Sequence, residues 1–197
     1  MFCMSLAFII SLLASDPLFA ANRSTTAHAQ LTAGDLTVIE ACARRLCEEA
    51  TGKNQTCKRL IVQRTTRITH TRLAGFAGLS TDDAGRQAVQ DLANTPAYSS
   101  MIERSRKVWI VPPIRDKEVE LVPHTRVDWC PGNGEQAIPY RLLFQFSAPG
   151  YAQNGEAALV YVHYKDCMSE GHALWSAKRR HGQWFAERKY VLWERGE

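Results

Sequence analysis

The segment of residues 157–193 constrains the fold most strongly, because apolar and aromatic side chains recur in it at alternating positions. A period of two is typical of β-strands, whose successive side chains point to opposite faces of a sheet. Three such runs follow one another, over residues 158–164, 172–178 and 183–193. We therefore expect these runs to form an antiparallel meander.

Both faces of the predicted meander carry large apolar side chains. The first run places Ala158, Val160, Val162 and Tyr164 on one face and Leu159, Tyr161 and His163 on the other. The second run places together Ala173, Trp175 and Ala177. The third run sets Trp184, Ala186, Tyr190 and Leu192 against Phe185, Val191 and Trp193. Gly182 can supply the positive φ of a tight turn between the last two runs. We expect a helix to cover one face, and loops or a partner to cover part of the other.

The beginning of the chain predicts export. Residues 4–14 form an apolar run that is shorter than the roughly 20 residues a membrane-spanning helix needs, as in the central region of a secretory signal peptide. Ala27-His28-Ala29 offers the small residues that signal peptidase cleaves after. We therefore expect a signal peptide over residues 1–29, a single domain over residues 30–197, a periplasmic or secreted location, and no transmembrane segment after cleavage.

The remaining elements can be placed from periodicity and from turn residues. The predicted order is a helix over 35–51, a strand over 60–69, a helix over 81–93, a strand over 108–111, an irregular connection over 118–139 and a strand over 140–147. This order predicts an α+β fold in which one or two N-terminal helices pack on a curved antiparallel sheet of about four to six strands, with the C-terminal meander at its centre. The nearest analogies are cystatin-like and nuclear-transport-factor-like folds.

Disulfides are permitted in an exported protein. Cys47 and Cys57 flank a predicted turn, and a bond between them would stabilise the fold by roughly 2–4 kcal/mol. Cys130 with Cys167 is the second predicted pair. Cys42 lies among apolar residues of the first predicted helix, and we expect a buried thiol there.

The order of several short motifs resembles a family of uncharacterised bacterial exported proteins that share an N-terminal helix and a C-terminal "ALVY … G-x-W … W" strand meander. The matching residues are Val89-Gln90-Asp91-Leu92-Ala93-Asn94, Trp129, Phe146-Ser147, Ala158-Leu159-Val160-Tyr161, Gly171, Gly182-Gln183-Trp184 and Trp193. The family often has a glycine-rich, cysteine-paired turn after the "ALVY" strand, where this chain has residues 166–171. The resemblance implies no activity.

The titratable candidates gather in the first hairpin of the meander. A small enzyme, of hydrolase or isomerase type, would use a pocket between helix and sheet with His163, His172 and Asp128 as weak catalytic candidates. His163, Cys167 and His172 could converge as zinc ligands, and Asp166 with Glu170 could form an acid/base pair. We favour a polar turn with a structural cysteine, so that neither a metal nor a cofactor is expected.

The candidate binding residues are Arg179, Arg180, His181, Trp175 and Tyr161. The basic run at the second hairpin could meet phosphate, lipid headgroups or an acidic polysaccharide, and the aromatic rings could stack on a sugar. The alternatives are a solubilising surface and tryptophans that belong to the core.

Charge limits the choice of partner. The chain has 24 lysines and arginines against 20 acidic residues, a net charge of +4, which is too mild and too scattered for a nucleic-acid binder. The leading hypothesis is a non-catalytic binding or interaction module of the periplasm or cell envelope, with a small ligand or an envelope protein as its partner. A small enzyme and a purely structural envelope protein are the alternatives.

Overall fold

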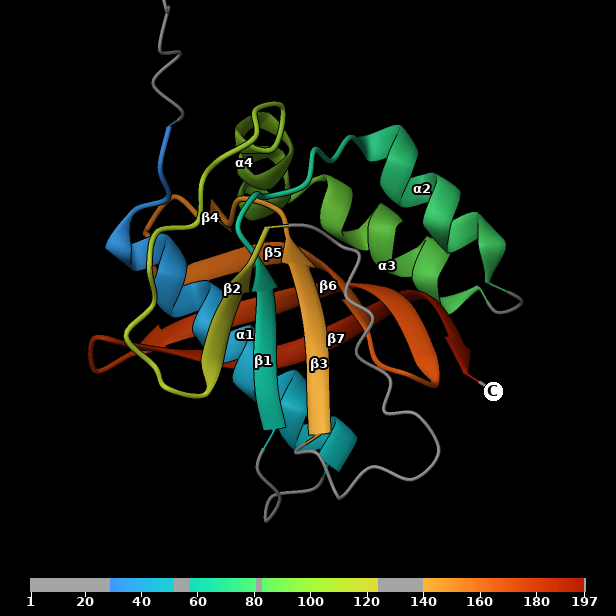
Figure 1. Cartoon of the computed structure of the whole chain (residues 1–197). Helices are drawn as coiled ribbons and strands as arrows, with labels where there is room; N and C mark the ends of the chain where they lie inside the picture. Colours follow the sequence, from blue (N-terminus) through green and yellow to red (C-terminus); the bar gives the residue numbers. More distant parts are fainter. Residues whose placement is uncertain (1–28, 52–56, 81–82, 124–139, 197) are drawn as a thin grey trace, which may run out of the picture.

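The computed structural model describes residues 29–51, 57–80, 83–123 and 140–196 (Figure 1). The helices in this part of the chain are α1 (Ala33–Thr51), α2 (His70–Leu79), α3 (Ala84–Ala93) and α4 (Pro96–Arg104). The strands are β1 (Cys57–Val62), β2 (Val119–Val122), β3 (Tyr140–Phe146), β4 (Gly150–Tyr151), β5 (Ala157–Lys165), β6 (Ser169–Arg180) and β7 (Gln183–Gly196).

The strands form one mostly antiparallel sheet in the order β2-β1-β3-β5-β6-β7, with β4 paired to β5. β1 runs parallel to β2 and β3, whereas every pairing from β3 to β7 is antiparallel. The α+β class with a curved sheet is therefore confirmed, and so is the C-terminal meander. Two details were wrong: the described sheet has seven strands rather than four to six, and the meander fills one half of it with β7 at the edge.

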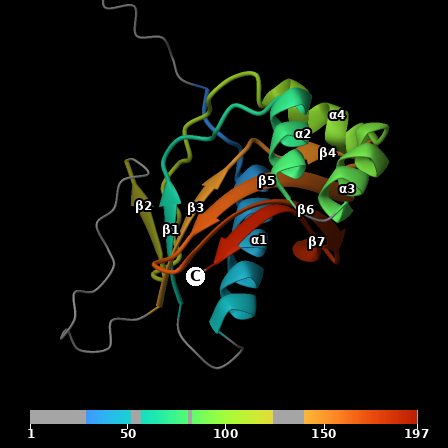
Figure 2. The same cartoon turned by 90° about the vertical axis from the view of Figure 1, so that its right-hand side faces the viewer.

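Helices cover both faces of the sheet (Figure 2). α1 packs on one face, where Ile39 and Ala43 contact a core that includes Phe144 of β3 and Trp175 of β6. α2, α3 and α4 lie against the other face of the meander. The apolar residues of this second core are Ile68, Leu73, Ala77, Val89, Tyr98, Met101, Leu159, Tyr161, Leu174 and Leu192. The two predicted faces of β5 thus belong to two separate cores.

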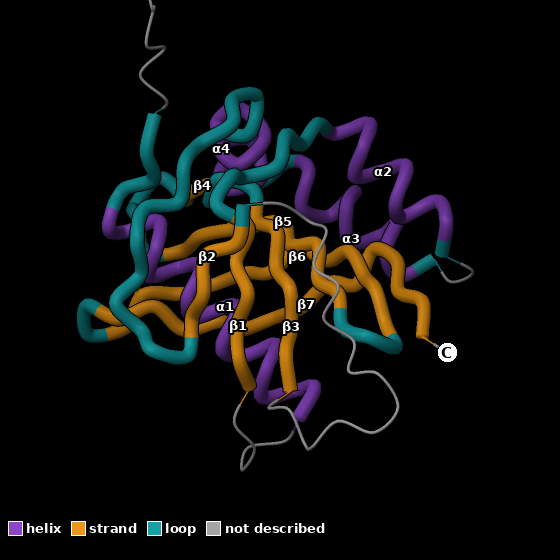
Figure 3. The backbone as a smooth tube through the Cα atoms, viewed as in Figure 1, coloured by secondary structure: helices purple, strands orange, loops and turns teal. Residues whose placement is uncertain are grey.

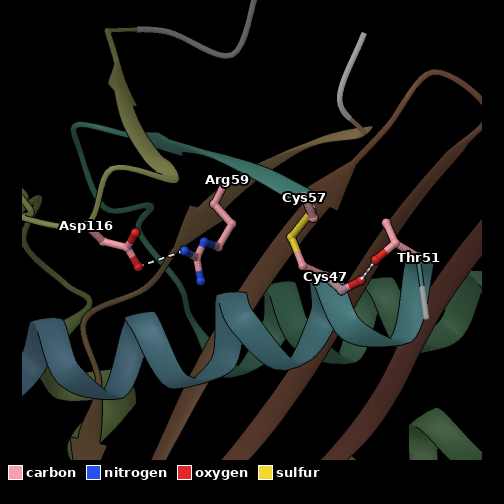
Figure 4. The surroundings of a disulfide bond; sticks show 5 residues. All are labelled: Cys47, Thr51, Cys57, Arg59 and Asp116. Carbon is pink, nitrogen blue, oxygen red and sulfur yellow. Dashed lines mark hydrogen bonds and ion pairs between the residues drawn. A yellow bond between two sulfur atoms is a disulfide. The ribbon is translucent and has the colours of Figure 1, made fainter. Parts of the chain in front are cut away.

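α1 is fixed at both of its ends. At its start the Thr32 hydroxyl accepts a hydrogen bond from the backbone N–H of Asp35, while an Asp35 carboxylate oxygen accepts one from the backbone N–H of Thr32. This reciprocal arrangement is a capping box. Near its end the predicted Cys47–Cys57 disulfide is present and ties α1 to β1 (Figure 4). Cys42 is a buried free thiol, as expected, and burial raises its pKa far above the ordinary value.

The region between β1 and β3 departs most from expectation. The predicted strand over 60–69 ends at Val62, and 108–111 contributes only isolated bridges through Ile110 (Figure 3). α2 and α4 were not predicted, because each presents only two buried residues to the core and so leaves a weak helical pattern in the sequence. β2 lies inside a stretch that was taken as irregular, and residues 124–139 of that stretch, which include Trp129, fall outside the described residues.

The predicted faces of β7 were wrong beyond its first residues. Trp184 and Ala186 pack against the α1 core, whereas Tyr190 and Leu192 pack against the core under α2–α4. One register shift in the pairing with β6 explains the change: between Ala177 and Ser176 the partner in β7 moves from Ala186 to Arg188, and this extra residue moves the following side chains to the opposite face.

The turn between β6 and β7 is the predicted two-residue hairpin. Both of its central residues have positive φ, 49° at His181 and 80° at Gly182. Such a turn matches the right-handed twist of the two strands it joins. It carries the basic residues of the hairpin to the end of the sheet where α1 begins (Figure 1).

Candidate functional site

Four polar residues meet on one face of the β5–β6 hairpin, and we call them the histidine cluster: Tyr161, His163, Glu170 and His172. His163 lies directly opposite His172 in the strand register. Tyr161 and Glu170 are the diagonal neighbours of this pair, two residues away on their own strands. Side chains in these positions are within reach of one another on the same face of an antiparallel sheet.

Two hydrogen bonds follow the diagonals of the register. The distance from His163 Nε2 to a carboxylate oxygen of Glu170 is 2.7 Å, and that from the Tyr161 hydroxyl to His172 Nδ1 is 2.6 Å. The two imidazole rings stack with their centroids 4.7 Å apart. Phe76 of α2 stacks on His172 at 3.9 Å, and Trp193 of β7 lies 5.5 Å from that ring. The cluster is therefore packed from two sides and ordered by its own hydrogen bonds.

The protonation states follow from these surroundings. Burial, together with the nearby charge of His163, lowers the pKa of His172 to about 4, so its ring is neutral at pH 7. Burial alone would raise the pKa of Glu170, but the hydrogen bond and charge of His163 outweigh it and hold that pKa below its ordinary value. The cluster thus combines a neutral imidazole with an ionised carboxylate.

Other residues of this hairpin have different roles. Asp166 accepts hydrogen bonds from the backbone N–H groups of Met168 and Ser169, so it shapes the turn. Cys167 is disulfide-bonded, which removes the thiolate that the suggested zinc set of His163, Cys167 and His172 required. Its predicted partner Cys130 lies outside the described residues, as does Asp128, so that pairing and that catalytic candidate stay predictions.

A cavity of about 530 Å³, which we call the tip pocket, lies at the opposite end of β6. It is bounded by the start of α1, by β4 and by the β6–β7 turn. Its side chains include those of Thr32, Arg104, Tyr151, Arg179 and Trp184. The aromatic rings of Tyr151 and Trp184 are neighbours, with centroids 5.8 Å apart.

Arg179 is the uncompensated cation of this pocket. Alternation along β6 puts Lys178 and Arg180 on one side of the hairpin, where both form ion pairs with Glu187. Arg179 points to the other side and lies opposite Trp184 in the register. Within the described residues it has no carboxylate partner; its guanidinium only reaches the backbone carbonyl of Gly182, at 3.5 Å.

Arg104, the second cation that lines the tip pocket, is by contrast fully paired. Both terminal nitrogens of the Arg104 guanidinium donate to the carboxylate of Asp35 at 2.8 Å, and Nη1 also donates to the carbonyl of Pro149. The Tyr151 hydroxyl donates to the same carboxylate. Burial would raise the pKa of Asp35, but these hydrogen bonds together with those from Thr32 hold it below its ordinary value. We call this arrangement the Asp35 network.

The remaining binding candidates are distributed over core and surface. Trp175 and Tyr161 are each only 1% exposed and belong to the two cores. Arg180 and His181 are exposed on the hairpin but do not line the tip pocket. The sequence did not point to Arg104 and Tyr151 as partners of Asp35, because the three residues come from distant segments.

Comparison with known proteins identifies no relative: no family model, no curated protein and no solved structure matches this chain. The resemblance to an exported family and the analogies to known folds therefore stay predictions. Within the described residues, no helix is long and apolar enough to cross a membrane.

Proposed function

We propose that this chain is an exported, non-catalytic binding module of the periplasm or cell envelope, and that its tip pocket holds a carboxylate-bearing sugar. The observation that carries the proposal is Arg179, a cation that lines a cavity beside two aromatic rings and has no carboxylate partner among the described residues. A free anion is the missing partner that the geometry accommodates.

The chemistry of the pocket favours an acidic sugar over a simple anion. An arginine binds a planar carboxylate through two parallel hydrogen bonds. The rings of Trp184 and Tyr151 offer apolar surface for the C–H face of a sugar ring, next to polar groups. A cavity of about 530 Å³ lies within the size range of small-ligand sites.

The electrostatics of the pocket support the same sign of charge. Because Asp35 is neutralised by Arg104, it does not repel an incoming carboxylate. Gly34, in the first turn of α1, lines the pocket, where the positive end of the helix dipole adds to the charge of Arg179. The Cys47–Cys57 disulfide supports the exported location, because such bonds persist in oxidising compartments.

The proposal predicts that Arg179→Gln weakens the binding of a uronic acid by about tenfold or more, because a charge-assisted bidentate contact is lost. The measurement is calorimetric titration of wild type and variant with glucuronate, galacturonate and short acidic oligosaccharides, with the neutral parent sugars as ligand controls. Arg180→Gln is the matched control, since it removes a neighbouring arginine that already pairs with Glu187. Equal affinity in wild type, Arg179→Gln and Arg180→Gln would reject the tip pocket as the binding site.

A small enzyme is the second candidate, and the histidine cluster is the observation that favours it. Two pairs of titratable groups lie within hydrogen-bond distance on a half-buried face of the sheet, as general acid–base chemistry requires. Turnover of any ligand of this chain that is abolished by His172→Gln would favour this candidate, whereas unchanged ligand recovered after incubation would favour the binding module.

A further inference from the structure

We infer that His163, Glu170 and His172 bind a divalent transition-metal ion of the Zn²⁺ type. One ligand atom from each of these three residues lies within 4.8 Å of the other two. The site is separate from the tip pocket, because it lies at the other end of β6 and shares no residue with it.

The ligand set has the right chemistry for such an ion. Imidazole nitrogen suits zinc, copper and nickel, whereas calcium and magnesium prefer sites built from oxygen alone. Two histidines with one carboxylate form a known type of three-residue zinc set, which leaves a fourth position for water. Glu170 takes the place that the sequence had suggested for Cys167.

The sheet register already gathers the ligands. Zinc holds nitrogen and oxygen ligands at about 2.0–2.2 Å, so two atoms of a tetrahedral site lie about 3.4 Å apart. From separations within 4.8 Å, no pair needs to approach by more than about 1.4 Å, and the hydrogen-bonded atoms of His163 and Glu170, 2.7 Å apart, need to separate slightly; side-chain rotation on fixed strands can supply both movements. The ion would replace the hydrogen bond that now joins His163 to Glu170.

The side chains around His172 hold this ligand in place. Tyr161 engages Nδ1 of His172, which leaves Nε2 of that ring as its free nitrogen. Phe76 and the ring of His163 stack on His172, so the orientation of this ring is limited. A hydrogen bond to the second nitrogen of a histidine is the usual support of a metal ligand.

Access and charge are compatible with binding from solution. The side chains of His163 and Glu170 are 18% and 36% exposed, so the ligand atoms are not sealed in the core. Arg72 and Lys165 act on the cluster as positive charges, and the carboxylate of Glu170 offsets them. The site therefore depends on Glu170 for charge as well as for coordination.

The test is calorimetric titration of the tag-free full chain with Zn²⁺, after all metal has been removed with a chelating resin. One Zn²⁺ per chain is expected to bind at this site, with no comparable heat from Mg²⁺. His163→Gln, Glu170→Gln and His172→Gln are each expected to lower the affinity at least tenfold. Tyr161→Phe removes only the supporting hydrogen bond and should lower it about 10–100-fold.

The matched controls are His181→Gln, at the exposed hairpin tip, and His70→Gln, whose ring contacts Tyr98 instead of the cluster. Both should bind Zn²⁺ like wild type, and circular dichroism should show that every variant is folded. Absence of saturable Zn²⁺ binding to the wild type would overturn the inference. So would an affinity that is unchanged in folded Glu170→Gln and His163→Gln, or one that falls in the two controls instead.

Discussion

Asp35→Ala is expected to lower the free energy of unfolding by about 3–5 kcal/mol, the range found when one partner of a buried ion pair is removed. The Asp35 side chain is fully buried, and its carboxylate accepts hydrogen bonds from Arg104, Tyr151 and Thr32. Without it, the guanidinium of Arg104 stays over the rings of Trp109 and Tyr151 and loses the counter-charge of Asp35. The capping box at the start of α1 is lost in the same step.

Guanidinium denaturation of wild type and variant measures this loss. Asp83→Ala is the matched control, because the Asp83 side chain is 86% exposed and pairs with Arg86 only at the surface. Its effect should stay within about 1 kcal/mol. Similar losses for both variants would contradict the role assigned to the Asp35 network.

The stability difference between wild type and Asp35→Ala should depend on pH in a defined way. The pKa of Asp35 is lower in the folded chain than its ordinary value of 3.8, so its stabilisation is complete above that ordinary value and is lost as pH falls through the folded pKa. The difference in unfolding free energy between wild type and Asp35→Ala should therefore be constant near neutral pH and shrink below about pH 4. An increase in this free-energy difference as the pH falls would contradict a lowered pKa of Asp35.

Gly150→Ala is the second variant with a large expected effect, a loss of about 3 kcal/mol or more from overpacking. A Cβ atom on Gly150 would lie 2.0 Å from the backbone nitrogen of Met101 and 2.3 Å from the backbone oxygen of Ala97. Both atoms belong to the backbone of α4, so no side-chain rotation can relieve the clash. The strand β4 and the helix must separate, which also displaces Tyr151 from Asp35.

Gly75→Ala is the control for this variant. Gly75 lies in the interior of α2, where an added Cβ meets no atom within 4 Å. The substitution should be neutral or stabilise the fold by up to about 1 kcal/mol, as expected for alanine in a helix. Thermal and guanidinium denaturation should therefore show a large loss of stability for Gly150→Ala and none for Gly75→Ala, and a Gly150→Ala protein as stable as wild type would contradict the close contact between β4 and α4.

Patterns that repeat along the chain were predictable from the sequence. The alternation in residues 158–164 identified β5 and its two faces, and the helical stripe around Ile39 and Ala43 identified α1. Cys47 and Cys57 are ten positions apart across a turn, and this spacing was enough to pair them. In each case the signal lies within one element or between two adjacent elements.

Features that depend on distant segments were not predictable in this way. Asp35 and Arg104 are 69 residues apart, and Tyr151 comes from a strand of two residues. β7 was misread after Ala186 because bulges leave no periodic trace in the sequence. In the histidine cluster the two histidines were found, but the choice of Glu170 over Cys167 needed the strand register and the disulfide.

The most direct test of the binding proposal is amide NMR of the full chain during titration with galacturonate. Gly34, Gly155 and Gly182 line the tip pocket from three separate segments of the chain, so a ligand in the pocket should shift all three amide signals together and saturably. Arg179→Gln should abolish these shifts at the same ligand concentration, while Arg180→Gln preserves them. Shifts confined to other parts of the molecule, or three unmoved glycines in the presence of bound sugar, would contradict the proposed site.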